Sequence, residues 1–237
     1  GKSKGKDTAP HDNNKTYNKP HGDLIQGLVL EWERSRSTKV SDEDRKKVIS
    51  DISKQVKGKV LEIGTNHKAS RIIQAVIKHG TKTEKDNLFK EISNPEAIIH
   101  LSRSSYGHFI VRSLLEITPK KDLTKVLSYF RGKIVPLARH PCGAAVLEIA
   151  YSLANSVQRA AMVAEFYGPE FALKAHGAIV KGGTGLTLKD ALADPQLGGR
   201  KAVIGHASRM LAGVWEKGMV TPAFMHRVMA EYLKEAP

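Results

Sequence analysis

The sequence is poor in cysteine, in aromatic residues and in long apolar runs. Cys142 is the single cysteine among 237 residues, which excludes an intramolecular disulfide and a zinc site built on several thiolates, and suits a reducing compartment. No apolar run approaches the roughly 20 residues that a membrane-spanning helix needs. The first residues lack the hydrophobic core of a signal peptide. We therefore expect a soluble protein that works inside the cell.

Acidic residues are also in deficit. The chain carries 24 Asp and Glu against 38 Lys and Arg, which gives a formal net charge of +14 and a sequence pI near 9.8. Basic residues outnumber acidic ones in each of the segments 1–60, 61–174 and 175–237. An excess spread along the whole chain is what a body lying along a polyanion requires, so the charge favours a nucleic-acid partner.

Apolar spacing divides the chain into a tail and a helical body. Residues 1–22 contain almost nothing apolar and cannot offset their ordering entropy by burial, so we predict a flexible basic tail there. From Asp23 onward apolar residues recur at helical spacing, beginning with Leu24, Ile25, Leu28 and Val29. Strand-like alternation is not sustained anywhere, which predicts an all-α fold.

The helical body contains an internal repeat. Three segments align at offsets of 38 and 36 residues, namely "ASRIIQAVI" (69–77), "GHFIVRSLL" (107–115) and "GAAVLEIAY" (143–151). Apolar positions coincide within and beyond these stretches: Ile72 with Ile110 and Val146, Ile92 with Phe130 and Phe166, Ile99 with Leu137 and Leu173. A small residue opens each aligned helix, as Ala69, Gly107 and Gly143. Apolar matches through three consecutive units predict a stacked helical repeat.

Atypical segments flank the repeats. We divide the chain into an atypical N-terminal unit over 23–66, three regular repeats over 67–174, a Gly-rich insert over 175–199 and an atypical C-terminal unit over 200–237. In such an α-solenoid each unit buries its apolar face only by stacking on its neighbours.

A polar triplet occupies one face of the first aligned helix. Ser70, Arg71 and Gln74 lie beside an apolar stripe, and residues four apart share a helix face. The same positions recur in the other units as His108/Phe109/Arg112, Ala144/Ala145/Glu148 and His226/Arg227/Ala230. A hydroxyl and an amide can donate to and accept from a base edge, and a planar guanidinium can cover a base face.

A period near 36, three short helices per unit and this triplet spacing resemble the Pumilio (PUF) RNA-binding repeat. The resemblance implies a right-handed α-solenoid of three-helix repeats, in which the outer triplet residues contact a base edge and the middle one stacks. "SRIIQ" looks like the family's adenine reader. "AEFYGPEFAL" (164–173) is similar to the divergent nucleolar Puf-A or Pumilio-homologue branch, whose members have more repeats than this chain, so the chain looks like part of a longer protein.

That branch implies a ribosome-assembly factor for the large subunit. The expected partners are pre-ribosomal RNA, bound with little sequence preference, together with ribosomal or assembly-factor proteins, and the expected location is the nucleolus or nucleus. Two other functions stay open. One is a protein-binding helical-repeat scaffold, and the other is an mRNA-binding translational regulator with a base-reading PUF code. RNA affinity that falls steeply with salt would favour the nucleic-acid interpretation over the scaffold.

The triplets depart from a base-reading code, because Ala145 cannot stack, Ala144 cannot hydrogen-bond through its side chain and Glu148 repels phosphate. We therefore predict a basic groove that binds phosphates and shape. The candidate RNA-binding residues are Lys68, Ser70, Arg71, Gln74, Arg103, His108, Phe109, Arg112, Arg139, His226 and Arg227. Plainer roles stay open for them: a solvated helix face, packing for Phe109, or ion pairs with carboxylates for Arg112 and Arg227.

Catalysis and cofactor binding find little support in the sequence. Cys142 lies two residues from His140, but it occupies the turn that opens a repeat, which explains it without nucleophilic chemistry. "GGTG" (182–185) has no following Walker-type lysine and no preceding strand. The ten histidines define no metal site. We expect no enzyme activity, no cofactor and no metal.

Overall fold

The computed structural model describes residues 21–36 and 40–236, and every regular element in them is helical. The predicted tail over 1–22 falls mostly outside these residues, although Gly22 already opens the first helix. The helices in chain order are α1 (Gly22–Ser35), α2 (Asp42–Val56), α3 (Val60–Ile63), α4 (His67–His79), α5 (Lys82–Ile92), α6 (Pro95–Ser102), α7 (Gly107–Ile117), α8 (Lys120–Ser128), α9 (Ile134–Ala138), α10 (Pro141–Leu153), α11 (Ser156–Ala164), α12 (Pro169–Val180), α13 (Leu188–Ala193), the 3-10 turn η2 (Pro195–Leu197), α14 (Gly199–Trp215) and α15 (Ala223–Glu235).

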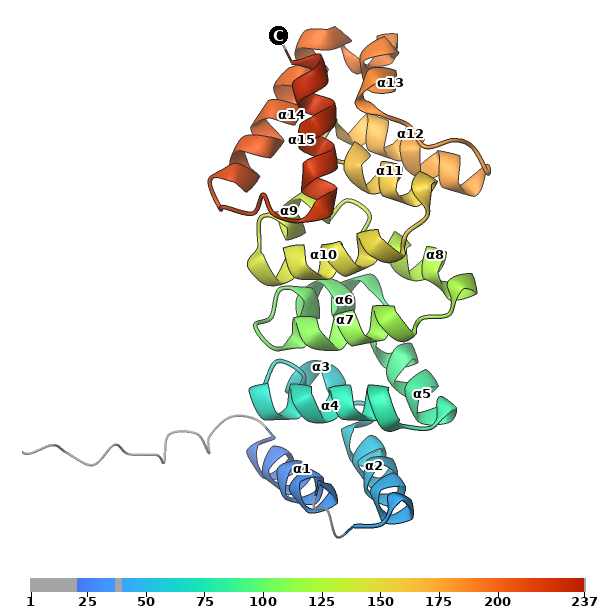
Figure 1. Cartoon of the computed structure of the whole chain (residues 1–237), viewed down its shortest axis with the longest axis vertical. Coiled ribbons are helices and arrows are strands. Elements are labelled where there is room, and N and C mark those ends of the chain that lie inside the picture. The colour runs from blue at the N-terminus through green and yellow to red at the C-terminus, as the bar shows by residue number, and fades with distance from the viewer. Residues whose placement is uncertain (1–20, 37–39, 237) are drawn as a thin grey trace, which may run out of the picture.

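The helices stack into an elongated α-solenoid (Figure 1). Three consecutive groups each hold a short, a long and a third helix: unit one is α3–α5, unit two is α6–α8 and unit three is α9–α11. The long helices α4, α7 and α10 lie one above another, with α1 against α4 at one end and α15 against α10 at the other. The all-α repeat architecture predicted from the apolar spacing is confirmed.

Matched positions of the repeat lie in the core. Ile72, Ile110 and Val146 are each at most 2% exposed. The glycines in the first turns of α7 and α10 have a steric reason. A Cβ on Gly107 would stand 3.0 Å from the carbonyl oxygen of Leu101, and one on Gly143 would stand 2.6 Å from that of Leu137. A larger residue there would push the long helix away from the short helix before it.

Local capping defines where several helices begin. Asn66 accepts from the backbone N–H groups of Lys68 and Ala69 at the start of α4. Thr81 and Glu84 form a capping box on α5, and Asn155 and Gln158 form another on α11. These side chains satisfy backbone donors that have no partner inside the helix.

The repeat ends after unit three. Leu173 matches the buried Leu137 in sequence but is 58% exposed, because α12 packs along α11. The Gly-rich segment leads from α12 into α13, which contacts α14 and α15. The helix α14 then packs against α9 and α15, so that α15 reaches the end of the stack next to α10.

Candidate nucleic-acid interface

Exposed cations and aromatic rings meet on the neighbouring helices α4 and α7. Lys68 and Arg71 are exposed on α4, Phe109 is 41% exposed on α7, and Arg103 is exposed just before α7. Arg112 lies over the Phe109 ring, with its guanidinium carbon 5.9 Å from the ring centroid. We call this region the α4–α7 surface, defined by Lys68, Arg71, Gln74, Arg103, Phe109 and Arg112.

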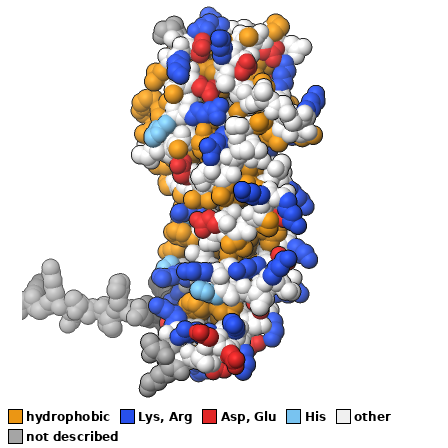
Figure 2. Space-filling model, turned by 45° about the vertical axis from the view of Figure 1, so that its right-hand side comes forward, with side chains coloured by type: hydrophobic (Ala, Val, Ile, Leu, Met, Phe, Trp, Pro, Cys, Tyr) orange, Lys and Arg blue, Asp and Glu red, His pale blue; other side chains and the backbone are white. Residues whose placement is uncertain are grey.

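The cations of this surface have no carboxylate partner among the residues that the structure describes. Within the described residues, Lys68, Arg71, Arg103 and Arg112 form no ion pair. The Nε of Arg112 is also buried without a hydrogen-bond partner there. Figure 2 shows Lys and Arg side chains across the lower half of the body, the half that holds α4 and α7 in Figure 1. Unpaired cations beside an exposed ring suit phosphate contact and base stacking.

Ser70 is hydrogen-bonded both to Gln74 and to the next unit. The Ser70 hydroxyl, in a residue only 1% exposed, donates to the Tyr106 carbonyl oxygen at 2.7 Å. It also accepts from Gln74 Nε2 at 3.1 Å. The triplet that sequence singles out therefore links α4 to the start of α7. Reading a base with Ser70 requires at least one of these bonds to change.

Three further rings, those of His67, Tyr106 and His140, belong to this region and were not among the RNA-binding candidates predicted from the sequence. The rings of His67 and Tyr106 lie 4.9 Å apart, and His108 and Phe109 lie 3.9 Å apart. His140 is close enough to Arg103 and His108 for their charges to act on it. Their position in the repeat could have identified them, because His67, Tyr106 and His140 each stand at the first turn or N-cap of a long helix.

The surroundings of His140 lower its pKa. Burial lowers the pKa of His140, and the charges of Arg103 and His108 lower it further. Its Nδ1 accepts from the backbone N–H of Gly143 at 3.4 Å and so caps α10. His108 is also buried, with Nδ1 3.0 Å from the Ser104 carbonyl oxygen.

The third triplet serves packing. Ala144 is buried, and the carboxylate of Glu148 accepts from the backbone N–H of Ala223 at 2.8 Å. Glu148 thus caps the first turn of α15, a favourable place for a negative charge. This contact gives a structural reason for an acidic residue at the triplet position that Gln74 holds in unit one.

Three of the sequence-predicted residues lie away from the α4–α7 surface. Arg139 is partly covered by α14, where its guanidinium donates to the Met210 carbonyl oxygen at 3.4 Å and lies against Gly213. His226 is exposed on α15. Arg227, one turn from Glu231, donates to its carboxylate at 2.9 Å.

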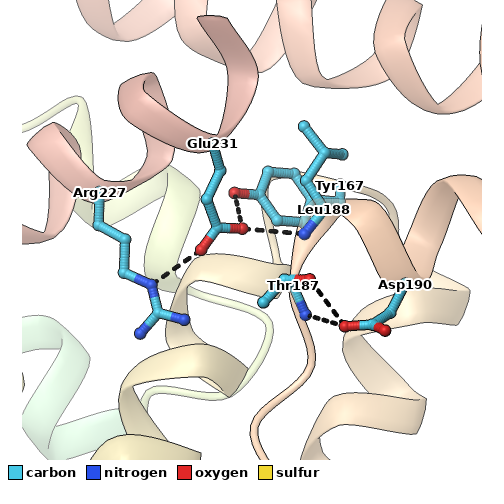
Figure 3. A network of polar contacts seen from close by, with 6 residues as sticks. All are labelled: Tyr167, Thr187, Leu188, Asp190, Arg227 and Glu231. Atoms are coloured by element: carbon cyan, nitrogen blue, oxygen red, sulfur yellow. Dashed lines mark hydrogen bonds and ion pairs between the residues drawn. The ribbon is translucent and has the colours of Figure 1, made fainter. Parts of the chain in front are cut away.

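Glu231 is the centre of a network that holds the insert to α15 (Figure 3). Its carboxylate accepts from the Tyr167 hydroxyl at 3.0 Å and from the backbone N–H of Leu188 at 2.9 Å, and it also pairs with Arg227. Burial raises the pKa of Tyr167, and the adjacent Glu231 adds to the effect. Arg227 is therefore committed to a structural ion pair.

The described residues contain no group of three or more side chains that could hold a metal ion. Along the same residues, no helix is both long and apolar enough to cross a membrane. The chemistry available on the α4–α7 surface is that of binding, through cations, amides and ring faces.

Comparison with known proteins agrees with the architecture. No family model matches the chain. It is 34% identical over 223 residues to Pumilio homolog 24 of Arabidopsis thaliana, which covers 92% of this chain and 33% of that protein. It is 26% identical to Pumilio homolog 3 of Rattus norvegicus over 95% of this chain and 34% of the relative. The chain thus spans about a third of the length of these curated relatives.

Solved structures show the same fold. Human Puf-A superposes with a TM-score of 0.75 at 24% identity, covering 91% of this chain and 41% of that one. Human Puf-A in complex with DNA gives a TM-score of 0.74 at 24% identity, over 92% and 42% of the two chains. This protein is an α-helical repeat protein built of stacked three-helix units. It belongs to the Pumilio-repeat proteins, and the curated relatives that it matches are Pumilio homologues.

Proposed function

We propose that this protein binds RNA through the α4–α7 surface, by phosphate contact and stacking with little sequence preference. The observation that carries the proposal is a group of exposed cations, Lys68, Arg71 and Arg103, on the same surface as the exposed ring of Phe109. These cations form no ion pair within residues 21–36 and 40–236. A strand laid along α4 and α7 meets cations for its phosphates and a ring face for a base. The nucleic-acid complex of the structurally similar Puf-A supports this assignment.

Phosphate contact is favoured over base reading by the state of the triplets. The Ser70 hydroxyl is already engaged with Tyr106 and Gln74, and Glu148 is engaged with α15. A continuous register of one base per unit therefore lacks free edge-reading side chains in units one and three.

We further propose a role in assembly of the large ribosomal subunit in the nucleolus, acting on pre-ribosomal RNA alongside ribosomal or assembly-factor proteins. The support for this role is the relatedness to the Pumilio-homologue branch.

The first test is the salt dependence of RNA binding. Affinity for a labelled oligouridine, measured by fluorescence anisotropy, should fall steeply as salt rises because phosphate binding releases counterions. The double variant R71Q/R103Q should bind more weakly and reduce the slope of log K against log salt by about 1.4, about 0.7 for each lost contact to a single strand. The matched control R209Q/K217Q removes two exposed cations of α14 and the turn after it, and should leave the slope nearly unchanged.

Two results would overturn the proposal. Equal effects of the two double variants would place RNA binding on overall charge instead of the α4–α7 surface. Discrimination among homopolymers greater than about tenfold, or about 1.4 kcal/mol, would show base reading.

For the cellular role, crosslinking to endogenous RNA should place contact sites in pre-ribosomal RNA. Enrichment of mature mRNA instead would contradict this role.

A further inference from the structure

A cationic groove lies beside unit two, between α6 and the connection from α8 to α9. Its volume is about 610 Å³, and the residues used below are Pro95, Ile99, Arg103, Tyr129, Arg131 and Lys133. Ile99 and Tyr129 are partly buried, whereas the three cations are exposed. One carboxylate, that of Glu96, also lines the groove. None of these charged groups forms an ion pair within residues 21–36 and 40–236.

The groove occurs where unit two departs from a contact found in units one and three. In unit one, Glu91 accepts from the backbone N–H groups of Gly58 and Val60 at 2.8 and 2.7 Å. In unit three, Glu165 accepts from Gly132 and Ile134 at 2.7 and 3.0 Å. Both carboxylates therefore cap the first helix of their own unit. The matching position in unit two is Tyr129, at the offsets of 38 and 36 residues that relate the repeats.

Unit two does not need that carboxylate, because its first helix caps itself. Asn94 accepts from the backbone N–H of Ala97 at 2.8 Å, and Pro95 occupies the first turn. The helix α6 is accordingly eight residues long, against four for α3 and five for α9. Unit two therefore has Tyr129 where the other units have a capping glutamate. The cations Arg103, Arg131 and Lys133 surround the apolar surface of Ile99 and Tyr129, without that capping carboxylate among them.

We propose that this groove docks an acidic peptide segment of a partner protein, with one apolar side chain as its anchor. Carboxylates of the peptide would pair with Arg103, Arg131 and Lys133, and the apolar anchor would lie against Ile99 and Tyr129. A partly buried phenol beside an aliphatic side chain suits an aliphatic anchor better than a stacked base, which needs an open ring face. Arg103 belongs to both this groove and the α4–α7 surface, so peptide and RNA compete.

The probe is a labelled peptide of alternating Asp and Glu with one central Leu. The control peptide has Ser in place of this Leu. The Leu peptide should bind the unmodified chain at physiological salt at least tenfold more tightly than the Ser peptide. The variant R131E/K133E should weaken binding at least tenfold, and so should Y129E, which restores the residue type of units one and three. The control K189E/K201E makes the same charge change on α13 and α14 and should have little effect. Circular dichroism verifies that each variant is folded.

Competition separates this proposal from the RNA-binding proposal. R131E/K133E should reduce oligouridine affinity less than R71Q/R103Q does, and the Leu peptide should compete with oligouridine through Arg103. If the peptide does not bind while R131E/K133E abolishes RNA binding, the groove belongs to the nucleic-acid path and the peptide proposal fails. Equal weakening by K189E/K201E, or equal binding of the Leu and Ser peptides, would show that peptide binding depends on overall charge. Either result would also overturn the peptide proposal.

Discussion

The hydroxyl of Ser70 donates to Tyr106 and accepts from Gln74, so one buried side chain joins two consecutive units. Replacing Ser70 with Ala leaves the Tyr106 carbonyl oxygen without this donor, and we expect a loss of about 1 kcal/mol in the free energy of unfolding. Urea denaturation measures the change. The control Gln74→Ala keeps the bond to Tyr106 and should cost less. An S70A variant as stable as the unmodified chain would mean that the interunit bond is unimportant, and would return Ser70 to the candidates for base contact.

The lowered pKa of His140 predicts the sign of a pH dependence of stability. Because its pKa is lowered in the folded state, by burial and by Arg103 and His108, the unfolded chain binds more protons as pH falls below about 6.5. The free energy of unfolding should therefore decrease as pH falls through that range. Protonation also occupies the Nδ1 that caps α10 and places a positive charge at a helix N-terminus.

His140→Asn tests this explanation, because asparagine caps a helix without titrating near neutral pH. We expect the variant to be folded and to lose stability less steeply than the unmodified chain between about pH 7.5 and about pH 5.5. Urea unfolding at several pH values measures the slope. His79→Asn changes an exposed histidine on α4 and serves as the control. Identical slopes for the unmodified chain and H140N would assign the pH dependence to other groups.

At the scale of the helices, two glutamates fasten the short first helices α3 and α9. Glu91→Ala removes a charged acceptor from two backbone N–H groups, and we expect a cost of about 1–3 kcal/mol in the free energy of unfolding. Glu165→Ala should behave alike, since its side chain is only 6% exposed. The control Glu116→Ala alters an exposed residue of α7 and should change stability little. If E91A and E116A are equally stable, α3 is held by packing alone.

The long helices could be predicted from sequence, whereas the contacts between side chains far apart in the sequence could not. Apolar spacing is a local signal, so the repeats containing Ile72, Ile110 and Val146 were identified correctly. Contacts such as Arg139 with Met210, 71 residues apart, leave no local pattern. The same holds for Glu148, whose partner lies 75 residues away on α15. The exposed rings of Phe109 and Tyr106 fall between these cases, because the repeat position drew attention to Phe109 and not to Tyr106.

At the scale of the whole molecule, the main contacts of each unit in the described residues are with its neighbours. The helix α7 packs against α4 and α10, while α1 and α2 at one end pack against each other and α4. Stability in such a stack is close to a sum of unit and interface contributions, so the position of a destabilising substitution decides how far its effect extends. The ends should therefore open without the middle.

A pair of fully buried residues tests this directly. Leu28 on α1 and Ile110 on α7 are both 0% exposed, and each change to Ala should cost about 2–5 kcal/mol where it acts. Amide hydrogen exchange should show Leu28→Ala removing protection from α1 and α2 while α7 and α10 stay protected. Ile110→Ala should instead lower protection through α4, α7 and α10, because a middle unit supports both neighbours. Uniform loss of protection in both variants would show that the described residues unfold as one cooperative body, and the nearest-neighbour description of this solenoid would be wrong.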